Sequence, residues 1–437
     1  MGLLTFTGGI HPSDRKELSK DKPIREASLP ERVIIPFSQH IGAPCKPLVT
    51  AGQEVKKGER IGEPAGFVSA PVHSSVSGKV TALRDCMNVM GRMIPAVEIA
   101  SDGRDEWTAL KDSPDYGNLS AEELKEKIKD AGIVGLGGAA FPTIVKLSPP
   151  KEKPIDTVII NGAECEPYLT VDYRLMIEHS REIVEGLGIL MKVLNVHQGY
   201  IGIENNKPEA LAVMQREIHE SGANEIQVVP MEVKYPQGAE KMLIQAITGR
   251  KVPPRALPMD VGVVVQNVST TFAVFEAVRY GKPLIERLVT VTGNGIREPA
   301  NLLSKVGTLF PHLINECGGF IDGVGKVIAG GPMMGFAVSS LDIPVTKGTS
   351  GILVLPESEV VHTGEFLPCI RCGRCIDVCP MGLMPSMLSI YAEKGLYEGA
   401  KEYNLWDCFE CGCCTYACPA KRPIVHFVRL AKSLTKP

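Results

Sequence analysis

Short apolar runs alternate with longer amphipathic stretches in the middle of the chain, and this alternation predicts a layered α/β domain. Runs such as TVII have the length of a buried strand, whereas the stretches between them repeat apolar residues at helical spacing. Strands separated by helices in this way form a largely parallel sheet with helices on both faces. The predicted strands are 157–160, 200–203 and 226–229, and the predicted helices are 170–193, 208–221 and about 239–248.

A further helix is predicted over residues 113–132, directly before a loop that is rich in glycine. Ser120 and Glu123 have the spacing of a capping box at the start of a helix. Gly132 is expected to end this helix, because glycine readily adopts the left-handed conformation of a helix C-cap. The loop that follows, GLGGAAFPT, covers residues 135–143.

The first 100 residues contain short valine and isoleucine runs separated by glycine turns, which predicts a β-rich unit. The stretch 52–83 resembles the hairpin pattern of lipoyl and biotinyl domains. Those domains carry a modified lysine at the tip of the hairpin, but here the tip, 64–71, reads PAGFVSAP and contains no lysine. A barrel-sandwich-like domain without the modified lysine is therefore expected.

Residues 285–355 again favour strands, and they are expected to form a small β-grasp module that resembles soluble ligand-binding domains. RLVTVTGNG at 287–295 and GILVLP at 351–356 are predicted strands, KVIAGGP at 326–332 lies between them, and one helix is expected near 308–316.

The length of 437 residues calls for several domains, and we expect a multidomain α/β protein of four parts. These are a barrel-sandwich-like domain (1–105), an α/β domain (113–280), a β-grasp module (285–355) and a cysteine-rich C-terminal domain (360–437). The net charge of −3 gives no electrostatic reason to bind nucleic acid, so no nucleic-acid partner is expected. No apolar run of about 18 residues predicts a transmembrane helix, and the N-terminus does not resemble a secretory signal.

Eight of the 13 cysteines form two groups with the same spacing, C-x2-C-x2-C-x3-C-P. This is the bacterial ferredoxin spacing for two 4Fe-4S clusters, in which the fourth cysteine of each group binds the other cluster. We expect one cluster on Cys369, Cys372, Cys375 and Cys418, and the other on Cys408, Cys411, Cys414 and Cys379.

Zinc is the main alternative, but a zinc site pairs two C-x2-C knuckles and has no use for a third cysteine at the next step. Cys413 is an extra thiol, expected to be a small buried hydrophobe. The segment between the two groups predicts helices, so the C-terminal domain is expected to be α-helical. The basic amphipathic stretch 420–432 is expected to cover a cluster, with a partner or a membrane surface as alternatives.

A cluster carries one electron at a time, so the donor has to be found elsewhere. Gly135, Gly137 and Gly138 would let backbone N–H groups approach a phosphate or a flat ring, although a plain turn explains them equally well. The strand 157–160 leads into NGAECEPY, residues 161–168, where polar side chains follow the carboxyl end of a strand. Ligands of α/β sheets bind at that edge.

Together with YPQGAEK (235–241), PPRALP (253–258) and QNVST (266–270), these segments resemble the FMN-bearing, NADH-oxidising subunit of respiratory complex I. The resemblance implies FMN and NADH sites. The implied cofactor-binding residues are Gly135, Gly137, Gly138, Phe141, Lys146, Asn161, Glu164, Gly238, Asn267 and Thr270. Glu166 and Glu240 match acidic residues that face the dinucleotide and are the candidate catalytic-site residues. The chain departs from that pattern at Leu136, Ala140, Ala163, Ala239 and Ser269.

Over nearly all of its length the chain resembles the RnfC family, whose members belong to Rnf complexes, the membrane NAD:ferredoxin oxidoreductases that pump ions. FTGGIHPSDRK (6–16), PFSQHIGAPCKPLV (36–49) and SAPVHSSVSGKV (69–80) carry this resemblance in particular. It implies an electron-transfer subunit that oxidises NADH through FMN and two 4Fe-4S clusters. The implied partners are other subunits of a membrane-bound complex, NAD(H) and, indirectly, ferredoxin. The implied location is peripheral, on the cytoplasmic face of the cell membrane.

Two other functions remain open on the sequence alone. One is a soluble flavo-iron–sulfur protein similar to the cobalamin reductase of propanediol-utilising microcompartments. The other is a non-enzymatic adapter that only relays electrons, for which Ala163 and Ala239 are the best support.

Overall fold

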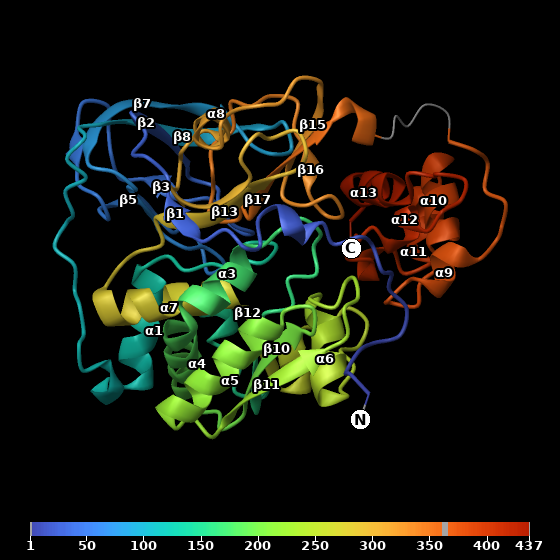
Figure 1. Cartoon of the computed structure of the whole chain (residues 1–437), viewed down its shortest axis with the longest axis horizontal. Coiled ribbons are helices and arrows are strands. Elements are labelled where there is room, and N and C mark those ends of the chain that lie inside the picture. The colour runs from blue at the N-terminus through green and yellow to red at the C-terminus, as the bar shows by residue number, and fades with distance from the viewer. Residues whose placement is uncertain (1, 361–365, 437) are drawn as a thin grey trace.

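The computed structural model describes residues 2–360 and 366–436 and has four β-sheets with an all-helical C-terminal domain at one end (Figure 1). The start of the expected C-terminal domain, 361–365, lies outside the described residues. No helix in the described part of the chain is both long and apolar enough to cross a bilayer.

The central sheet is fully parallel, with strand order β11-β10-β9-β12, as the alternating pattern predicted. Neighbouring residues of β9 point to opposite faces: Val158 and Ile160 join one buried core, and Ile159 joins another. Helices cover both faces. The strands are β9 (Thr157–Asn161), β10 (Gly199–Glu204), β11 (Ile226–Met231) and β12 (Val263–Asn267).

Two of the four helices predicted in this domain match their predicted positions and two differ, while the helices at 143–146 and 268–280 were not predicted. The expected helix 170–193 is two helices, because His179 between them has non-helical backbone angles, with φ −135° and ψ 39°. The expected helix 113–132 begins only at the Ser120 cap, where both hydrogen bonds of the capping box form. The helices are α1 (Ala121–Asp130), α2 (Thr143–Lys146), α3 (Val171–Glu178), α4 (Ser180–Leu194), α5 (Pro208–Ser221), α6 (Glu240–Thr248) and α7 (Val268–Tyr280).

Two small antiparallel sheets near the N-terminus enclose a valine- and isoleucine-rich core, as expected of a barrel sandwich. Their orders are β2-β8-β7-β4 and β3-β5-β6. The strands are β2 (Arg32–Pro36), β3 (Lys46–Pro47), β4 (Glu54–Val55), β5 (Arg60–Glu63), β6 (Val72–His73), β7 (Gly78–Met87) and β8 (Met93–Ser101).

A six-stranded mixed sheet follows, with strand order β1-β14-β13-β17-β15-β16. Strand β1 (Ile24–Glu26) comes from the N-terminal segment and pairs in parallel with β14, so this segment also belongs to the later sheet. The other elements are β13 (Glu286–Thr292), β14 (Ala300–Lys305), β15 (Val324–Ala329), β16 (Phe336–Ala337), β17 (Gly351–Pro356) and α8 (Phe310–Glu316).

The C-terminal domain is helical, as expected, and packs around a core of its own. The N-terminal segment passes between this domain and the parallel sheet: Gly9 N donates to Val378 O at 2.9 Å, and Ile10 N donates to Tyr235 O at 2.8 Å. The helices are α9 (Arg374–Asp377), α10 (Pro385–Glu393), α11 (Tyr397–Lys401), α12 (Cys413–Tyr416) and α13 (Ile424–Leu434).

Candidate functional site

The glycine loop lies against the start of α7 and is open on its other side. Leu136 N donates to Thr270 Oγ1 at 2.9 Å. A Cβ added at Gly137 would come within 2.7 Å of Asn267 Nδ2, whereas one added at Gly138 would meet no protein atom. The loop is therefore fixed to the protein at one glycine and leaves bare backbone facing open space at the next. Such a surface fits close approach by a flat ring or a phosphate.

Residues from three elements converge beside this loop at the carboxyl edge of the sheet. Asn161 and Asn267 end the adjacent parallel strands β9 and β12 and are paired in register. Asn161 Nδ2 donates to Gly238 O at 2.7 Å. The Asn267 Oδ1 atom accepts from Ser269 N at 2.8 Å and caps α7, while its Nδ2 donates to Asp172 Oδ2 at 2.7 Å. The structure thus brings together the predicted residues of the glycine loop and both strand ends.

Lys146 and Glu240 form an ion pair at the same edge. Their Nζ and Oε1 atoms are 2.6 Å apart, and the lysine also donates to Val265 O at 3.0 Å. The side chains keep 27% and 35% of their exposure, so both remain reachable by a ligand. Glu240 is also the first residue of α6, where the positive end of the helix dipole favours a carboxylate. Phe141, which lies five residues before Lys146, is half-buried.

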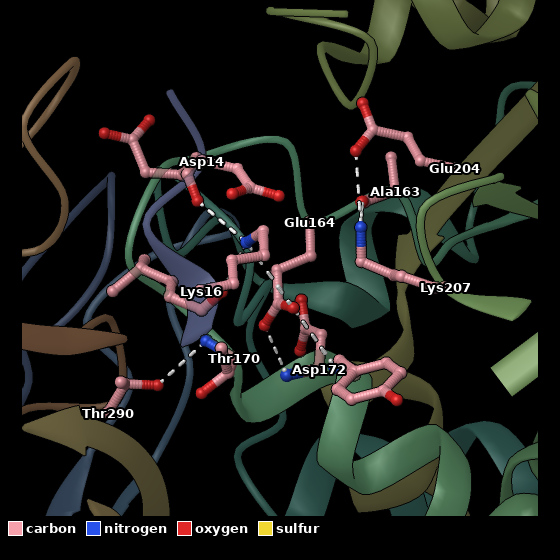
Figure 2. A network of polar contacts seen from close by, with 12 residues as sticks. Asp14, Lys16, Ala163, Glu164, Thr170, Asp172, Glu204, Lys207 and Thr290 are labelled. Atoms are coloured by element: carbon pink, nitrogen blue, oxygen red, sulfur yellow. Dashed lines mark hydrogen bonds and ion pairs between the residues drawn. The ribbon is translucent and has the colours of Figure 1, made fainter. Parts of the chain in front are cut away.

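Glu164 has a different position from the one expected of a flavin contact. Its carboxylate caps α3, accepting from Asp172 N at 2.7 Å and from Tyr173 N at 3.3 Å. The side chain is 4% exposed and lies 3.8 Å from Lys16 Nζ, as Figure 2 shows. Burial raises the pKa of this carboxyl, and the nearby Lys16 ammonium opposes that rise. Glu164 therefore acts on the site through the helix it caps.

The buried network around Glu164 extends further than the sequence indicated (Figure 2). Lys207 Nζ donates to Ala163 O at 2.7 Å and pairs with Glu204 at 3.3 Å. Lys16 Nζ donates to the carbonyls of Glu166 and Leu169. These donors hold the 161–168 loop from two sides. No local sequence pattern indicated these contacts, although Lys16 belongs to the FTGGIHPSDRK segment.

Glu166, the other predicted acidic residue, contacts the six-stranded sheet module. Its Oε1 accepts from Met333 N at 2.7 Å and from Met334 N at 3.2 Å, so the carboxylate points to the loop between β15 and β16. Gly331 makes room for it, since an added Cβ there would lie 2.2 Å from Glu166 Cγ. Burial raises the pKa of this carboxyl. Glu166 joins the parallel-sheet domain to the six-stranded sheet.

A buried arginine supports the glycine loop from behind, and no sequence motif indicated it. Arg287 is 2% exposed. Its Nη2 donates to Leu136 O and its Nε donates to Thr349 O at 2.7 Å. Burial lowers the pKa of this guanidinium to about 10, and the more distant Asp172 carboxylate opposes the change. The loop lacks the arginine of the complex I pattern at position 136, yet a guanidinium from β13 contacts that position.

The thiols of the C-terminal domain lie in two neighbourhoods. Burial raises the pKa of Cys414, and the charges of Cys408, Cys411 and Cys379 raise it further. Cys379, the fourth cysteine of the first group, thus lies with the second group.

In the other neighbourhood, Cys418, the fourth cysteine of the second group, lies with Cys369 and Cys375 of the first group. Burial raises the pKa of Cys375, Ser386 hydrogen bonds lower it, and Cys369 and Cys418 raise it. Cys372 is exposed. Within residues 2–360 and 366–436 no group of three or more His, Cys, Asp or Glu is placed to hold a metal ion. A cubane differs from a single ion because each thiolate binds a separate iron, and four thiolates fit a 4Fe-4S cluster.

The second cysteine group directly contacts the parallel-sheet domain. Tyr235 Oη donates to Cys411 O at 2.8 Å, and Cys413 Sγ lies 3.8 Å from Tyr235 O. Arg255 N donates to Asp407 Oδ1 at 2.8 Å. Cys413 is fully buried in an apolar cluster, as expected of a small hydrophobe.

Four family models match successive parts of this chain. They are the RnfC barrel sandwich hybrid domain (4–104), the Nuo51 FMN-binding domain (128–276), the SLBB domain (288–337) and the 4Fe-4S dicluster domain (365–419). The chain is 52% identical over 433 residues to the C subunit of the proton-translocating ferredoxin:NAD(+) oxidoreductase complex of Clostridium ljungdahlii, covering 99% of this chain and 94% of that protein.

The chain belongs to the RnfC family. It is also 48% identical to the C subunit of the Na(+)-translocating ferredoxin:NAD(+) oxidoreductase complex of Acetobacterium woodii, over 98% of this chain and 96% of that one. Among solved structures, an NAD+-reducing [NiFe]-hydrogenase in the H2-reduced state aligns with a TM-score of 0.51 at 16% identity, covering 75% of this chain and 66% of that one. At that identity the likeness concerns the fold alone.

Proposed function

We propose that this chain is the NADH-oxidising electron-transfer subunit of a membrane redox-driven ion pump, and that it also reduces NAD+ when electrons flow in reverse. The relatives that match almost its full length are named as members of ion-translocating ferredoxin:NAD(+) oxidoreductase complexes. Electrons enter from NADH at an FMN, pass through two 4Fe-4S clusters and leave to partner subunits and, through them, to ferredoxin. The four-part division 1–105, 113–280, 285–355 and 360–437 belongs to this proposal.

The observation that carries the proposal is the contact between the two redox parts of one chain. Gly238 belongs to the candidate flavin edge, and its N–H donates to Cys165 Sγ at 3.3 Å. Cys165 packs in the same apolar cluster as Tyr235 and Cys411. A flavin held at the glycine loop would therefore connect to a cluster through packed protein.

The residues at the sheet edge have complementary tasks in this function. Bound FMN supplies the conversion between a two-electron hydride donor and one-electron clusters. The bare backbone of Gly135, Gly137 and Gly138 and the N-terminus of α7 at Asn267 and Thr270 would hold its ring and phosphate. The remaining candidate contacts are Asn161, Gly238 and Phe141.

The Lys146–Glu240 pair would set the charge and orientation of the bound groups. Lys146 would keep a positive charge beside the polar edge of the ring, where negative charge develops on reduction. Glu240 would orient the nucleotide, and its pairing with Lys146 fixes its direction. The eight cysteines would hold the clusters in the two crossed sets.

The place in the cell is also part of the proposal. The names of the relatives describe ion-translocating complexes, which act across a membrane. We place this chain peripherally, on the cytoplasmic face, with NAD(H) as its soluble substrate.

The test is anaerobic purification followed by a visible spectrum before and after addition of NADH. About eight iron atoms per chain, one FMN, and bleaching of both chromophores by NADH are expected. Clusters without flavin, and without bleaching by NADH, would leave only the relay-adapter function.

Glycine variants localise the flavin within this experiment. Gly137→Ala is expected to displace the loop from Asn267 and lose FMN while keeping iron. Gly138→Ala meets no protein atom, so any loss of FMN there must come from contact with the flavin itself. Gly188→Ala in α4 also meets no atom and serves as the control, with FMN and iron retained.

A further inference from the structure

The two cysteine sets have very different surroundings. The set of Cys379, Cys408, Cys411 and Cys414 lies against the parallel-sheet domain through the Tyr235–Cys411 hydrogen bond of 2.8 Å. Met333 of the six-stranded sheet module also contacts it, since a Cβ at Gly412 would be 3.1 Å from Met333 O. This set is therefore enclosed by the rest of the chain on the side of the candidate flavin site.

The other set opens to solvent. Cys372 is exposed, and the segment around it carries the apolar side chains of Leu367 and Ile370, which are 61% and 66% exposed. In Figure 1 the orange segment leading into α9 runs along the side of the helical domain turned away from the parallel sheet. A cluster held here would come close to the protein surface at Cys372.

Positive charge surrounds this opening. Arg371, Arg374 and Lys421 are exposed, and no salt bridge joins them to another residue of the described ranges. Leu367 N donates to Ala420 O at 3.1 Å, which brings Lys421 beside the Cys372 segment. Within residues 366–380, Asp377 is the only acidic residue, and it is exposed. The face thus combines an apolar centre with a cationic rim.

We propose that the two clusters work in a fixed order and that this face is the electron exit of the chain. The enclosed cluster on Cys379, Cys408, Cys411 and Cys414 exchanges electrons with the flavin. The cluster with exposed Cys372 exchanges them with a redox protein that docks through a carboxylate-bearing surface. This inference rests on the proposed function and adds to it the order of the clusters and the chemistry of the partner.

The electron count is balanced by two successive transfers. Each NADH that is oxidised to NAD+ brings two electrons into the chain and releases one proton to solvent. Each electron then passes from the enclosed cluster to the exposed one and reduces a one-electron acceptor of the partner, so two transfers return both clusters to the oxidised state. In the reverse direction the partner is the donor at the same face.

A protein fits this face better than a lipid surface does. Electron transfer needs an acceptor close to the cluster, and an anionic headgroup cannot accept an electron. Redox encounters use small interfaces with a few apolar contacts, which agrees with two exposed apolar residues beside Cys372. Charges on the rim then raise the rate of encounter and make it sensitive to salt.

The exit face is tested with the triple variant R371E/R374E/K421E in the complete chain. The matched control is K46E/K79E/R216E, which reverses three exposed cations on other domains. Each chain is added to membranes that contain the complex without this component. Binding and NADH-dependent reduction of the membrane-bound acceptors are measured at low ionic strength and at about 0.15 M salt. Binding of each chain to vesicles of anionic phospholipid is measured in parallel.

In the exit-face variant, both the rate of acceptor reduction and the affinity for the membranes should fall at least about tenfold at low ionic strength. NADH should still bleach the flavin and both clusters of the isolated variant. The control should match the native chain in every measurement. Equal behaviour of the two triple variants, or a loss explained by vesicle binding, overturns the exit face. Failure of NADH to bleach the native chain refutes the proposed function instead.

The order of the clusters is tested with single cysteine variants in the isolated chain. With Cys372→Ala, NADH should still reduce the enclosed cluster, seen by its electron paramagnetic resonance signal. With Cys411→Ala, the flavin should bleach while the exposed cluster stays oxidised. Reduction of the exposed cluster at the native rate in the Cys411 variant would overturn the order.

Discussion

Replacing Arg287 with Met should weaken FMN binding while the chain stays folded. The substitution removes both donors that reach Leu136 O and Thr349 O but keeps an apolar side chain of similar length. Two buried carbonyls left without a donor cost about 1–3 kcal/mol each, or about 2–6 kcal/mol together. Against this, the drop of the arginine pKa from 12.5 to about 10 means that keeping the guanidinium charged costs about 3 kcal/mol, and this cost disappears.

The two effects nearly cancel in the whole protein but not in the loop. The net change in the free energy of unfolding is about −3 to +1 kcal/mol, whereas the glycine loop loses its attachment to β13 outright. FMN should therefore bind at least about tenfold more weakly, which corresponds to about 1.4 kcal/mol, while the chain stays folded.

The assay is the dissociation constant for FMN of the deflavinated chain, measured beside anaerobic thermal unfolding. Arg216→Met, on the exposed surface of α5, is the control and should change neither quantity. Arg287→Lys keeps one donor group and should fall between the native chain and the Met variant. Native FMN affinity in the Arg287→Met variant would refute the role given to this side chain.

Three further outcomes follow from the buried groups and the cysteine sets. Lys347 is 1% exposed, and burial lowers its pKa to about 7. Between pH 7 and 9 the unfolded chain therefore binds more protons than the native chain, so the free energy of unfolding rises with pH. Over those two pH units the rise is about 2 kcal/mol, because the native lysine is still half protonated at pH 7, and anaerobic unfolding of Lys347→Met should lack it. Cys413→Ala should keep about eight iron atoms per chain, whereas Cys411→Ala should lose about four, as an iron assay would show. Glu240→Gln should bind the nucleotide more weakly and raise the KM for NADH about tenfold or more. The flavin content of the same preparation should be unchanged. An unchanged KM would contradict the role given to Glu240.

The sequence predicted the parallel-sheet domain well because its signal is local. Strand β9 ends within one residue of the prediction, and α5 covers the predicted residues 208–221. The break at His179 was missed because the apolar periodicity continues across it, while the packing of its ring on Phe272, with centroids 4.9 Å apart, comes from another helix. Strand β1 was missed because three residues without an apolar pattern become a strand only by pairing with β14.

The same distinction separates the site residues. Candidate cluster ligands can be proposed from sequence because their spacing is itself the geometric requirement. Arg287 and Glu166 depend on partners 151 and 167 residues away, which no local pattern encodes. The motif placed Glu166 in the loop after β9 but could not show that its carboxylate would accept a hydrogen bond from Met333 N.

The N-terminal segment explains why a chain of this family needs more than a flavin domain and a ferredoxin-like domain. Gly9 has a left-handed backbone, and an added Cβ would lie 2.7 Å from Tyr235 O, so only glycine allows the segment to pass there. One side of that segment contacts Val378, beside Cys379, and the other contacts Tyr235, which in turn bonds Cys411. Further along, Lys16 holds the 161–168 loop. One continuous segment thus fixes both redox parts against each other. Because the rate of electron transfer falls steeply with distance, this segment helps to set the distance on which the rate depends.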